Sequence, residues 1–441
     1  MSNPKRYDCA IIGAGISGLS TAYFLKNKFQ NIALIDGPKF GGVIKTIKNE
    51  GFTLECGPNV VALKPAFLEL IQDLGITSEL EFPQVPNYQQ MVYFNEEACC
   101  VPKGPLAFLR SNLMSINDKV RIIKGIFKSK AISPGNPDLS VAEFFAPIFG
   151  VKTVKNIIDP VLLGIFGGDV DQLSAKSIFP RIYEKISSGA SFFSSIKSRT
   201  ARPKIAVFKN GMSSLTDRLE TEALKNVSCI RTFVSKLEKS DGYFELSLEN
   251  QERLSAKNVF ICTSGKSTAA YLSTLDNEFS GRLKQMNFAS LTVVHAYTKD
   301  LPAEFHNSFG VLFPSKLHSP LLGIMFNSRL FSHLAPAGSE LLTICFGGVH
   351  HPDFIKKSDD QVWELAKREI AGNLKIAQIE FLNICRWENA IPQYNLGHAN
   401  LSAAARSFEE KHPGLKFVGA DFGGVGVPDR VQAAKNASLG Q

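Results

Sequence analysis

The fold is decided by the stretch Cys9-Ala10-Ile11-Ile12-Gly13-Ala14-Gly15-Ile16-Ser17-Gly18 near the start of the chain. Its first four residues form a short apolar run that predicts a β-strand, and residues 19–25 continue with helical spacing. A second apolar run, residues 31–35, ends on Asp36. Strand, glycine-rich turn, helix and strand are the context in which a G-x-G-x-x-G motif binds a dinucleotide. The alternative is a glycine-rich turn in an unrelated α/β unit.

The residue types in this motif suit the chemistry of a pyrophosphate. Gly13 permits a tight turn, Gly15 lets the pyrophosphate approach the backbone, and Gly18 lets helix and strand pack closely. The helix N-terminus offers N–H groups and the positive end of its dipole. We expect Asp36 to accept hydrogen bonds from the ribose hydroxyls. The predicted cofactor contacts of this segment are Gly13, Ala14, Gly15, Ile16, Ser17, Gly18 and Asp36.

Length and composition limit the class of protein. With 441 residues, 44% hydrophobic and 20% charged, the chain predicts two or three folded domains and excludes global disorder. The net charge of +8 suits acidic small molecules or anionic lipid, but no Lys/Arg block resembles a nucleic-acid-binding arm. The polar N-terminus lacks a signal-peptide core, and no apolar run reaches the roughly 18 residues of a membrane-spanning helix. We therefore expect a cytoplasmic chain, with peripheral attachment to the inner face of the cell membrane left open.

The eight cysteines form no C-x-x-C pair and no regular ladder. This spacing predicts buried thiols in a reducing compartment, without disulfides and without a zinc site. His350 and His351 are adjacent, but no Cys or acidic residue stands at metal-ligand spacing, so no metal site is expected.

The remaining segments predict a three-part organisation. Helix- and strand-like patterns in residues 208–263 and 415–438 resemble further parts of the nucleotide-binding unit. We therefore predict an α/β fold with one discontinuous Rossmann-like domain from residues 1–85, 205–275 and 385–441. Residues 276–384 have β character and predict a mixed-sheet substrate domain, whereas residues 86–204 look helical.

A basic amphipathic helix is expected at residues 119–130 of the helical interval. Ile122, Ile123, Ile126 and Phe127 fall on one face, and five Lys or Arg residues carry the rest. Such a helix either lies in an anionic lipid interface or covers a core with a solvated face.

Five further motifs carry a resemblance to a known family. The chain has Gly41-Gly42 after Asp36 and a Gly57-Pro58 turn, as in the FAD-dependent amine-oxidase superfamily. Residues 159–180, 387–398 (WENAIPQYNLGH) and 423–429 (GGVGVPD) resemble, in order, segments of the protoporphyrinogen oxidases. This resemblance covers nearly the whole chain.

The resemblance implies an FAD enzyme that oxidises protoporphyrinogen IX to protoporphyrin IX in haem biosynthesis, in three two-electron steps with oxygen as acceptor. Similar enzymes act on coproporphyrinogen III, and a flavin amine oxidase or desaturase is a further alternative on the same scaffold. The implied third domain is a helical membrane-binding domain, which corresponds to residues 86–204. The expected partners are a porphyrinogen, oxygen and, as options, a membrane surface and a second copy of the chain, but no nucleic acid.

The resemblance also implies which residues of this chain contact the cofactor and the substrate. In the family, the second glycine pair and the Gly-Pro turn approach the flavin, and the closing turn contacts it. Trp387 is either near the flavin or a core aromatic, and Phe331 either stacks on a pyrrole ring or packs in a core. The further cofactor residues implied are Gly41, Gly42, Gly57, Pro58, Asn59, Val60, Val234, Trp387, Val425, Gly426, Val427 and Pro428. The substrate-lining residues implied are Gly167, Gly168, Leu312 and Phe331.

One departure from the family concerns the substrate carboxylates. Many relatives place an Arg where Leu106 stands here, and that Arg pairs with a propionate. Lys103 or Arg110 could take its place, since either pairs with a carboxylate; we predict Arg110. No catalytic acid or base is predicted, because the flavin accepts the hydride and the protein positions the macrocycle.

Overall fold

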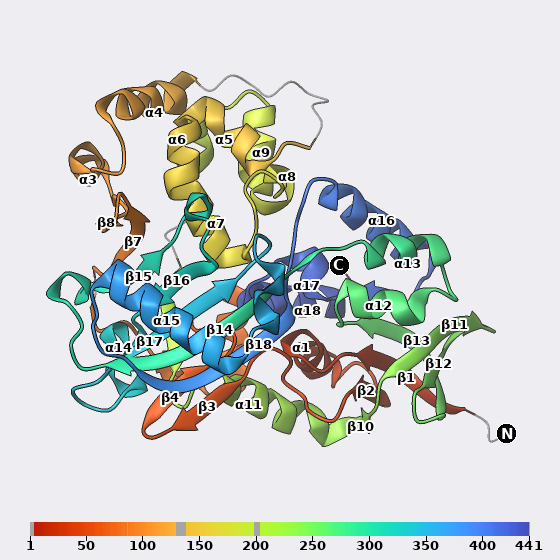
Figure 1. Ribbon diagram of the computed structural model, residues 1–441. Coiled ribbons are helices and arrows are strands. Elements are labelled where there is room, and N and C mark those ends of the chain that lie inside the picture. Colours follow the sequence, from red (N-terminus) through yellow and green to blue (C-terminus); the bar gives the residue numbers. More distant parts are fainter. Residues whose placement is uncertain (1–3, 86, 129–137, 198–202, 441) are drawn as a thin grey trace.

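The computed structural model describes residues 4–85, 87–128, 138–197 and 203–440 (Figure 1). Two seven-stranded sheets and a helical cap form the molecule. The mixed α/β fold class expected from the sequence is confirmed.

The first sheet has the strand order β10-β2-β1-β13-β12-β11, with β19 also paired to β13. Strands β1, β2, β10, β13 and β19 run parallel, while β11 and β12 are antiparallel additions. Their bounds are β1 Lys5–Ile12, β2 Ile32–Asp36, β10 Val227–Arg231, β11 Val234–Ser240, β12 Tyr243–Leu248, β13 Arg253–Ile261 and β19 Leu415–Phe417. The strands therefore come from three separate stretches of the chain.

Helices cover both faces of this sheet because successive strand residues point to opposite sides. Cys9 and Ile11 pack on one side with α1, α2, α11 and α18, whereas Ala10 and Ile12 pack on the other with α12, α13 and α16. The helix bounds are α1 Ile16–Leu25, α2 Pro65–Asp73, α11 Ser213–Ala223, α12 Gly265–Leu272, α13 Asn277–Lys284, α16 His398–Lys411 and α18 Val427–Ser438.

The second sheet has the order β18-β14-β17-β16-β15-β7-β8 and is antiparallel except between β15 and β7. Helix α15 (Asp359–Leu374) packs on one face, against Val294 and Ile344. The opposite face carries Val293, which packs against Cys56 from the N-terminal part of the predicted nucleotide-binding domain. The strand bounds are β7 Gln89–Phe94, β8 Glu97–Cys100, β14 Phe288–Thr298, β15 Ser308–Leu312, β16 Leu321–Met325, β17 Glu340–Gly347 and β18 Glu380–Pro392.

The observed sheets differ from the predicted organisation in two stretches of the chain. Residues 86–204 were expected to be helical, yet they begin with β7 and β8, which extend the second sheet. Strand β18 pairs with β14 although most of it lies in the stretch 385–441 that we assigned to the nucleotide side. The pairing partners of these strands are distant in sequence, so no local pattern reveals them.

Two small sheets connect the layers. Strands β3 (Thr46–Asn49) and β4 (Phe52–Glu55) form a hairpin, and β9 (Ile205–Phe208) joins β5 (Val61–Ala62) to β6 (Leu80–Glu81).

The helical cap lies above the second sheet in Figure 1 and has its own core around Phe144, Phe145 and Phe166. Its elements are α3 Pro105–Arg110, α4 Ile116–Lys128, α5 Val141–Phe149, α6 Val151–Thr153, the π-helical η2 Val154–Ile158, α7 Asp159–Phe166, α8 Ala175–Ile178, α9 Pro180–Ser187 and α10 Phe192–Lys197. Among the described helices, none has both the length and the apolar character needed to cross a bilayer.

Candidate active site

The first glycine loop joins β1 to α1 and has the geometry expected from its residue types. Gly13 has φ of +101°, in the region that favours glycine. A Cβ on Gly18 would stand 1.7 Å from the carbonyl oxygen of Gly13, so only glycine allows this packing. A Cβ on Gly15 would meet only Gly42 Cα, at 3.8 Å. Helix α1 begins after Gly15 without a side-chain cap, which leaves its N-terminus for a ligand.

Asp36, at the end of β2, braces this loop. One carboxylate oxygen accepts the N–H of Ala14 at 2.6 Å and the other accepts that of Gly37 at 2.8 Å. A carboxylate oxygen has a second lone pair, so both can also accept from a ribose hydroxyl. No pattern in the sequence indicates this loop-bracing contact.

The second glycine pair touches the first loop. Gly41 donates its N–H to Ala14 O at 2.9 Å. Gly41 and Gly42 have φ of +105° and +62°, and a Cβ on Gly42 would come within 3.2 Å of Gly15 Cα. Two side-chain-free loops thus form a main-chain cradle beside the N-terminus of α1. This arrangement fits a dinucleotide, because side chains at these positions would fill the cradle.

Val234 begins β11, close to Asp36. The ring of Phe233 would contact a Cβ on Gly37 at 2.5 Å, which places this segment beside the end of β2. Val234 itself is 8% exposed. The predicted contact of the Val234 backbone with the cofactor is therefore compatible with its position near Asp36, which we expect to bind the ribose.

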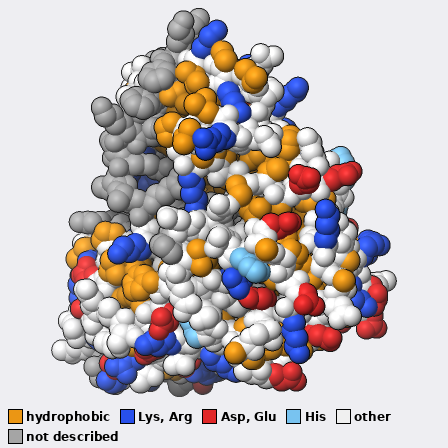
Figure 2. Space-filling model, turned by 90° about the vertical axis from the view of Figure 1, so that its left-hand side faces the viewer, with side chains coloured by type: hydrophobic (Ala, Val, Ile, Leu, Met, Phe, Trp, Pro, Cys, Tyr) orange, Lys and Arg blue, Asp and Glu red, His pale blue; other side chains and the backbone are white. Residues whose placement is uncertain are grey.

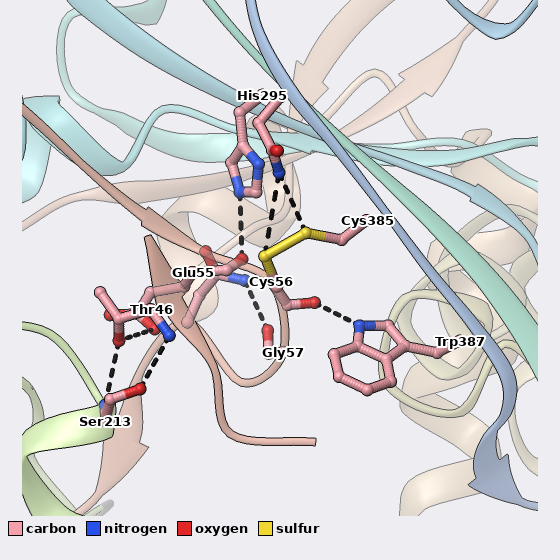
Figure 3. The surroundings of a disulfide bond; sticks show 10 residues. Thr46, Glu55, Cys56, Gly57, Ser213, His295, Cys385 and Trp387 are labelled. Carbon is pink, nitrogen blue, oxygen red and sulfur yellow. Dashed lines mark hydrogen bonds between the residues drawn. A yellow bond between two sulfur atoms is a disulfide. The ribbon is translucent and has the colours of Figure 1, made fainter. Parts of the chain in front are cut away.

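The second sheet holds residues 55 and 56, which lead into the turn 57–60, and Asn327 holds the turn itself (Figure 3). The indole N–H of Trp387 donates to Cys56 O at 2.7 Å, and His295 Nε2 lies 3.0 Å from Glu55 O. Asn327 Nδ2 donates to Asn59 Oδ1 at 2.7 Å. Trp387 packs in a cluster with Val293 and has a structural task, anchoring this turn to β18.

A disulfide joins Cys56 to Cys385, beside the same turn (Figure 3). The expectation of thiols without disulfides is therefore wrong for this pair. The two residues are 329 positions apart in the sequence. Cys385 reaches Cys56 because β18 pairs with β14, where Cys385 lies opposite Val293. The expectation of burial is also wrong for Cys100 and Cys229, whose side chains are exposed.

Two buried titratable groups flank the disulfide. Glu55 is 4% exposed, and burial raises the pKa of its carboxyl to about 7 although it accepts the N–H of Met212 and the hydroxyl of Thr46. Burial lowers the pKa of His295 to about 4, so its imidazole is neutral at pH 7. Glu55 thereby tethers the start of α11 to the turn, and His295 contributes no positive charge there.

The closing turn leads into α18 from Gly426, which caps the helix without a side chain. The hydroxyl of Tyr394 donates to Ala420 O and lies 2.9 Å from the N–H of Gly424, from which it accepts. The ring of His398 stacks on Tyr394 with centroids 4.1 Å apart. These contacts fix the turn that holds the predicted residues Val425 to Pro428.

The predicted substrate residues separate into two groups. A Cβ on Gly167 would approach Ala289 Cβ to 3.0 Å, and one on Gly168 would approach Gln393 Oε1 to 2.5 Å. Leu312 packs against Gly164 of α7. Gly167, Gly168 and Leu312 therefore gather around the end of α7.

The structure does not bring Phe331 and Arg110 to this place. Phe331 is 1% exposed in a core with Phe52 and Leu54, so its ring is already covered. Arg110 is exposed on α3, which lies apart from the end of α7 in Figure 1. Lys103 donates to Tyr88 O and lies over the Tyr88 ring.

The segment Gln393–His398 links the two sides of the site. Gln393 Nε2 donates to Phe166 O at 2.8 Å, at the end of α7. Tyr394 and His398 reach the closing turn, where His398 Nε2 lies 2.7 Å from Asp421 O. We identified this segment only by its resemblance, and its linking role becomes visible only in the tertiary structure.

Comparison with known proteins gives consistent results. A family model described as flavin containing amine oxidoreductase matches residues 16–438. Coproporphyrinogen III oxidase of Bacillus subtilis is 27% identical, with 99% of this chain and 98% of the relative covered. Chloroplastic protoporphyrinogen oxidase of Nicotiana tabacum is 25% identical, with 97% and 84% covered.

Solved structures agree on the fold. A chain from Exiguobacterium sp. 255-15 superposes with a TM-score of 0.83 at 23% identity, and each chain is covered in full. Reduced UDP-galactopyranose mutase superposes at 0.74 with 16% identity, covering 100% of this chain and 94% of that one. At these identities the likeness shows the shared architecture alone.

Proposed function

The chain belongs to the flavin containing amine oxidoreductase family, and on this premise we propose that it oxidises protoporphyrinogen IX to protoporphyrin IX. The observation that carries the proposal is the full-length similarity to relatives named as porphyrinogen oxidases. The cofactor of this oxidoreductase is FAD, which fits the cradle of Gly13, Gly15 and Gly42.

Bound FAD supplies a two-electron acceptor for a hydride, and no protein side chain offers an equivalent. The task of the chain is to orient a meso carbon and to exclude water. Gln393 supports this role by joining the end of α7 to the closing turn through Tyr394. We assign no catalytic acid or base, and we propose oxygen as the electron acceptor in each of three rounds.

The first experiment tests flavin reduction and substrate choice together. Anaerobic mixing with protoporphyrinogen should bleach the yellow flavin band, and admission of air should restore it. Parallel initial rates with coproporphyrinogen III then decide between the substrates, because one relative is named for each. A higher specificity constant for coproporphyrinogen would reassign the substrate, and an unbleached flavin would end the proposal. Oxygen consumption during turnover tests the acceptor.

We also propose that the helical cap binds an anionic membrane surface. Leu106, Leu109 and Ile116 are 60%, 59% and 78% exposed on α3 and α4, beside the exposed cations Arg121 and Lys124. In Figure 2, hydrophobic and basic side chains gather on the upper part of this face. Apolar side chains rimmed by Lys and Arg suit an interface with anionic lipid.

The exposed set differs from the predicted face of the helix. Ile122 is 5% exposed and packs inward with Leu113, whereas Val120 and Ile123 are each 45% exposed. The side chains of residues 127–130 lie outside the described part. Replacing both Ile116 and Ile123 by Asp should abolish cosedimentation with phosphatidylglycerol vesicles, and binding that persists would refute this face. A concentration-dependent dimer lost in the same variant would instead identify a second copy as the partner.

A further inference from the structure

Arg430 is a buried cation whose donors are only partly used. It lies in the first turn of α18 with 3% of its surface exposed. One terminal nitrogen donates to Gly419 O, while Nε and the other terminal nitrogen are buried without a partner. Arg430 forms no ion pair with a carboxylate of the described residues. Arginine stays charged in proteins, and a buried charge with unsatisfied donors is costly. The positive charge of Arg430 is therefore not neutralised by an ion pair with any carboxylate of the described residues.

The guanidinium lies close to the dinucleotide cradle. A Cβ on Gly423 would stand 2.8 Å from the terminal nitrogen that has no partner. A Cβ on Gly419 would stand 2.7 Å from Thr263 O, and one on Gly13 would stand 3.0 Å from Thr263 N. Arg430 therefore lies beside the closing turn. That segment lies beside the end of β13, and the end of β13 lies beside the first glycine loop.

Two carboxylates of the described residues, Asp421 and Asp429, act on this cation. Asp429 pairs with Lys64, which neutralises it. Asp421 is 1% exposed, accepts the N–H of Gly265 at 2.6 Å with one oxygen, and has no partner for the other. Burial raises the pKa of Asp421 to about 6, so this carboxyl is mostly ionised at pH 7 and loses its charge below about pH 6. The N-termini of α1 and α18 add further positive potential without side-chain caps.

We propose that Arg430 is a positioning residue for the cofactor: its buried positive charge, set behind the closing turn, attracts the diphosphate that the N-termini of α1 and α18 hold. The proposal rests on FAD as the cofactor. The two nitrogens without partners are shielded from solvent, so Arg430 acts through its field and not by direct contact. A buried charge behind a low-dielectric wall is screened less than a charge in solvent.

Competitive displacement of FAD from the full chain tests the diphosphate directly. ADP and adenosine share the base and ribose but differ in two phosphates. Arg430→Met should weaken ADP binding about tenfold, or 1.4 kcal/mol, and change adenosine binding less than twofold. Arg430→Lys should retain most of the selectivity. Lys435→Met is the matched control, since Lys435 lies on the same helix but pairs with Glu69 at the surface, and it should leave both affinities unchanged.

The opposite charge change gives a second readout. Asp421→Asn removes a buried carboxylate that acts on Arg430 and should tighten ADP about threefold relative to adenosine. The Asp421→Asn variant still tests the proposal if Arg430→Met does not fold. Unchanged selectivity between ADP and adenosine in Asp421→Asn would overturn the proposal. An equal loss of affinity for both ligands in Arg430→Met would also overturn it. The assay uses no porphyrinogen, so wild type that binds ADP but oxidises no porphyrinogen defeats the proposed substrate and leaves this inference intact.

Discussion

Replacing Glu55 by Gln should remove a pH-dependent loss of stability. The carboxyl is buried between β4 and the start of α11, and its pKa is raised from 4.5 to about 7 by that burial. Gln keeps an acceptor for the N–H of Met212 and presents an amide to Thr46, the two partners of Glu55. The substitution removes the titrating carboxyl. The bond from Met212 is kept, and the bond to Thr46 reverses because the amide donates to the hydroxyl.

The sign follows from proton linkage. Between pH 4.5 and 7 the folded protein holds the proton of Glu55 and the unfolded chain releases it, so stability falls as the pH rises through this window. Raising this pKa from 4.5 to about 7 corresponds to about 3 kcal/mol. With an unfolding entropy of about 2.1 cal/mol/K per residue and 441 residues, this is about 3 °C in the melting temperature.

The assay compares melting temperatures of wild type and Glu55→Gln at pH 5, 6, 7 and 8. Wild type should lose about 3 °C relative to the variant across this range. His295 titrates with the opposite sign, because its pKa is lowered to about 4, but it is present in both proteins and cancels in the difference. Glu278→Gln, at an exposed position on α13, should give a profile parallel to wild type. Parallel profiles for Glu55→Gln as well would refute the assigned burial of the charge.

Three further outcomes are expected. Alkylation in denaturant without reductant should label six of the eight cysteines, since Cys56 and Cys385 are paired; eight labels by mass spectrometry would contradict the disulfide. Gly15→Ala should lose FAD while keeping the melting temperature of the apoprotein, because its Cβ meets nothing closer than 3.8 Å, whereas Gly18→Ala should destabilise the fold, because its Cβ would stand 1.7 Å from Gly13 O. Tyr394→Phe removes the hydroxyl contacts to Ala420 and Gly424, at a cost of about 1–3 kcal/mol for the unsatisfied main-chain groups; FAD should dissociate at least several-fold faster, and an unchanged off-rate would show that the turn does not depend on Tyr394.

The α/β class and the glycine loop were predictable from the residues alone. Strand, turn and helix around Gly13 to Gly18 follow from short-range sterics, because the left-handed turn at Gly13 and the close packing at Gly18 exclude side chains. The amphipathic pattern likewise indicated α4. The pattern did not predict which side of α4 faces inward, because the buried position of Ile122 depends on the neighbours that pack against the helix.

How distant segments meet at the site depends on long-range packing. The pairing of β14 with β18 sets Cys385 and Trp387 beside Cys56, and the fold sets Arg430 behind the closing turn. It also covered Phe331 and left Arg110 at the surface of α3. Local periodicity records which side of an element is apolar, but register and burial arise from packing between elements hundreds of residues apart.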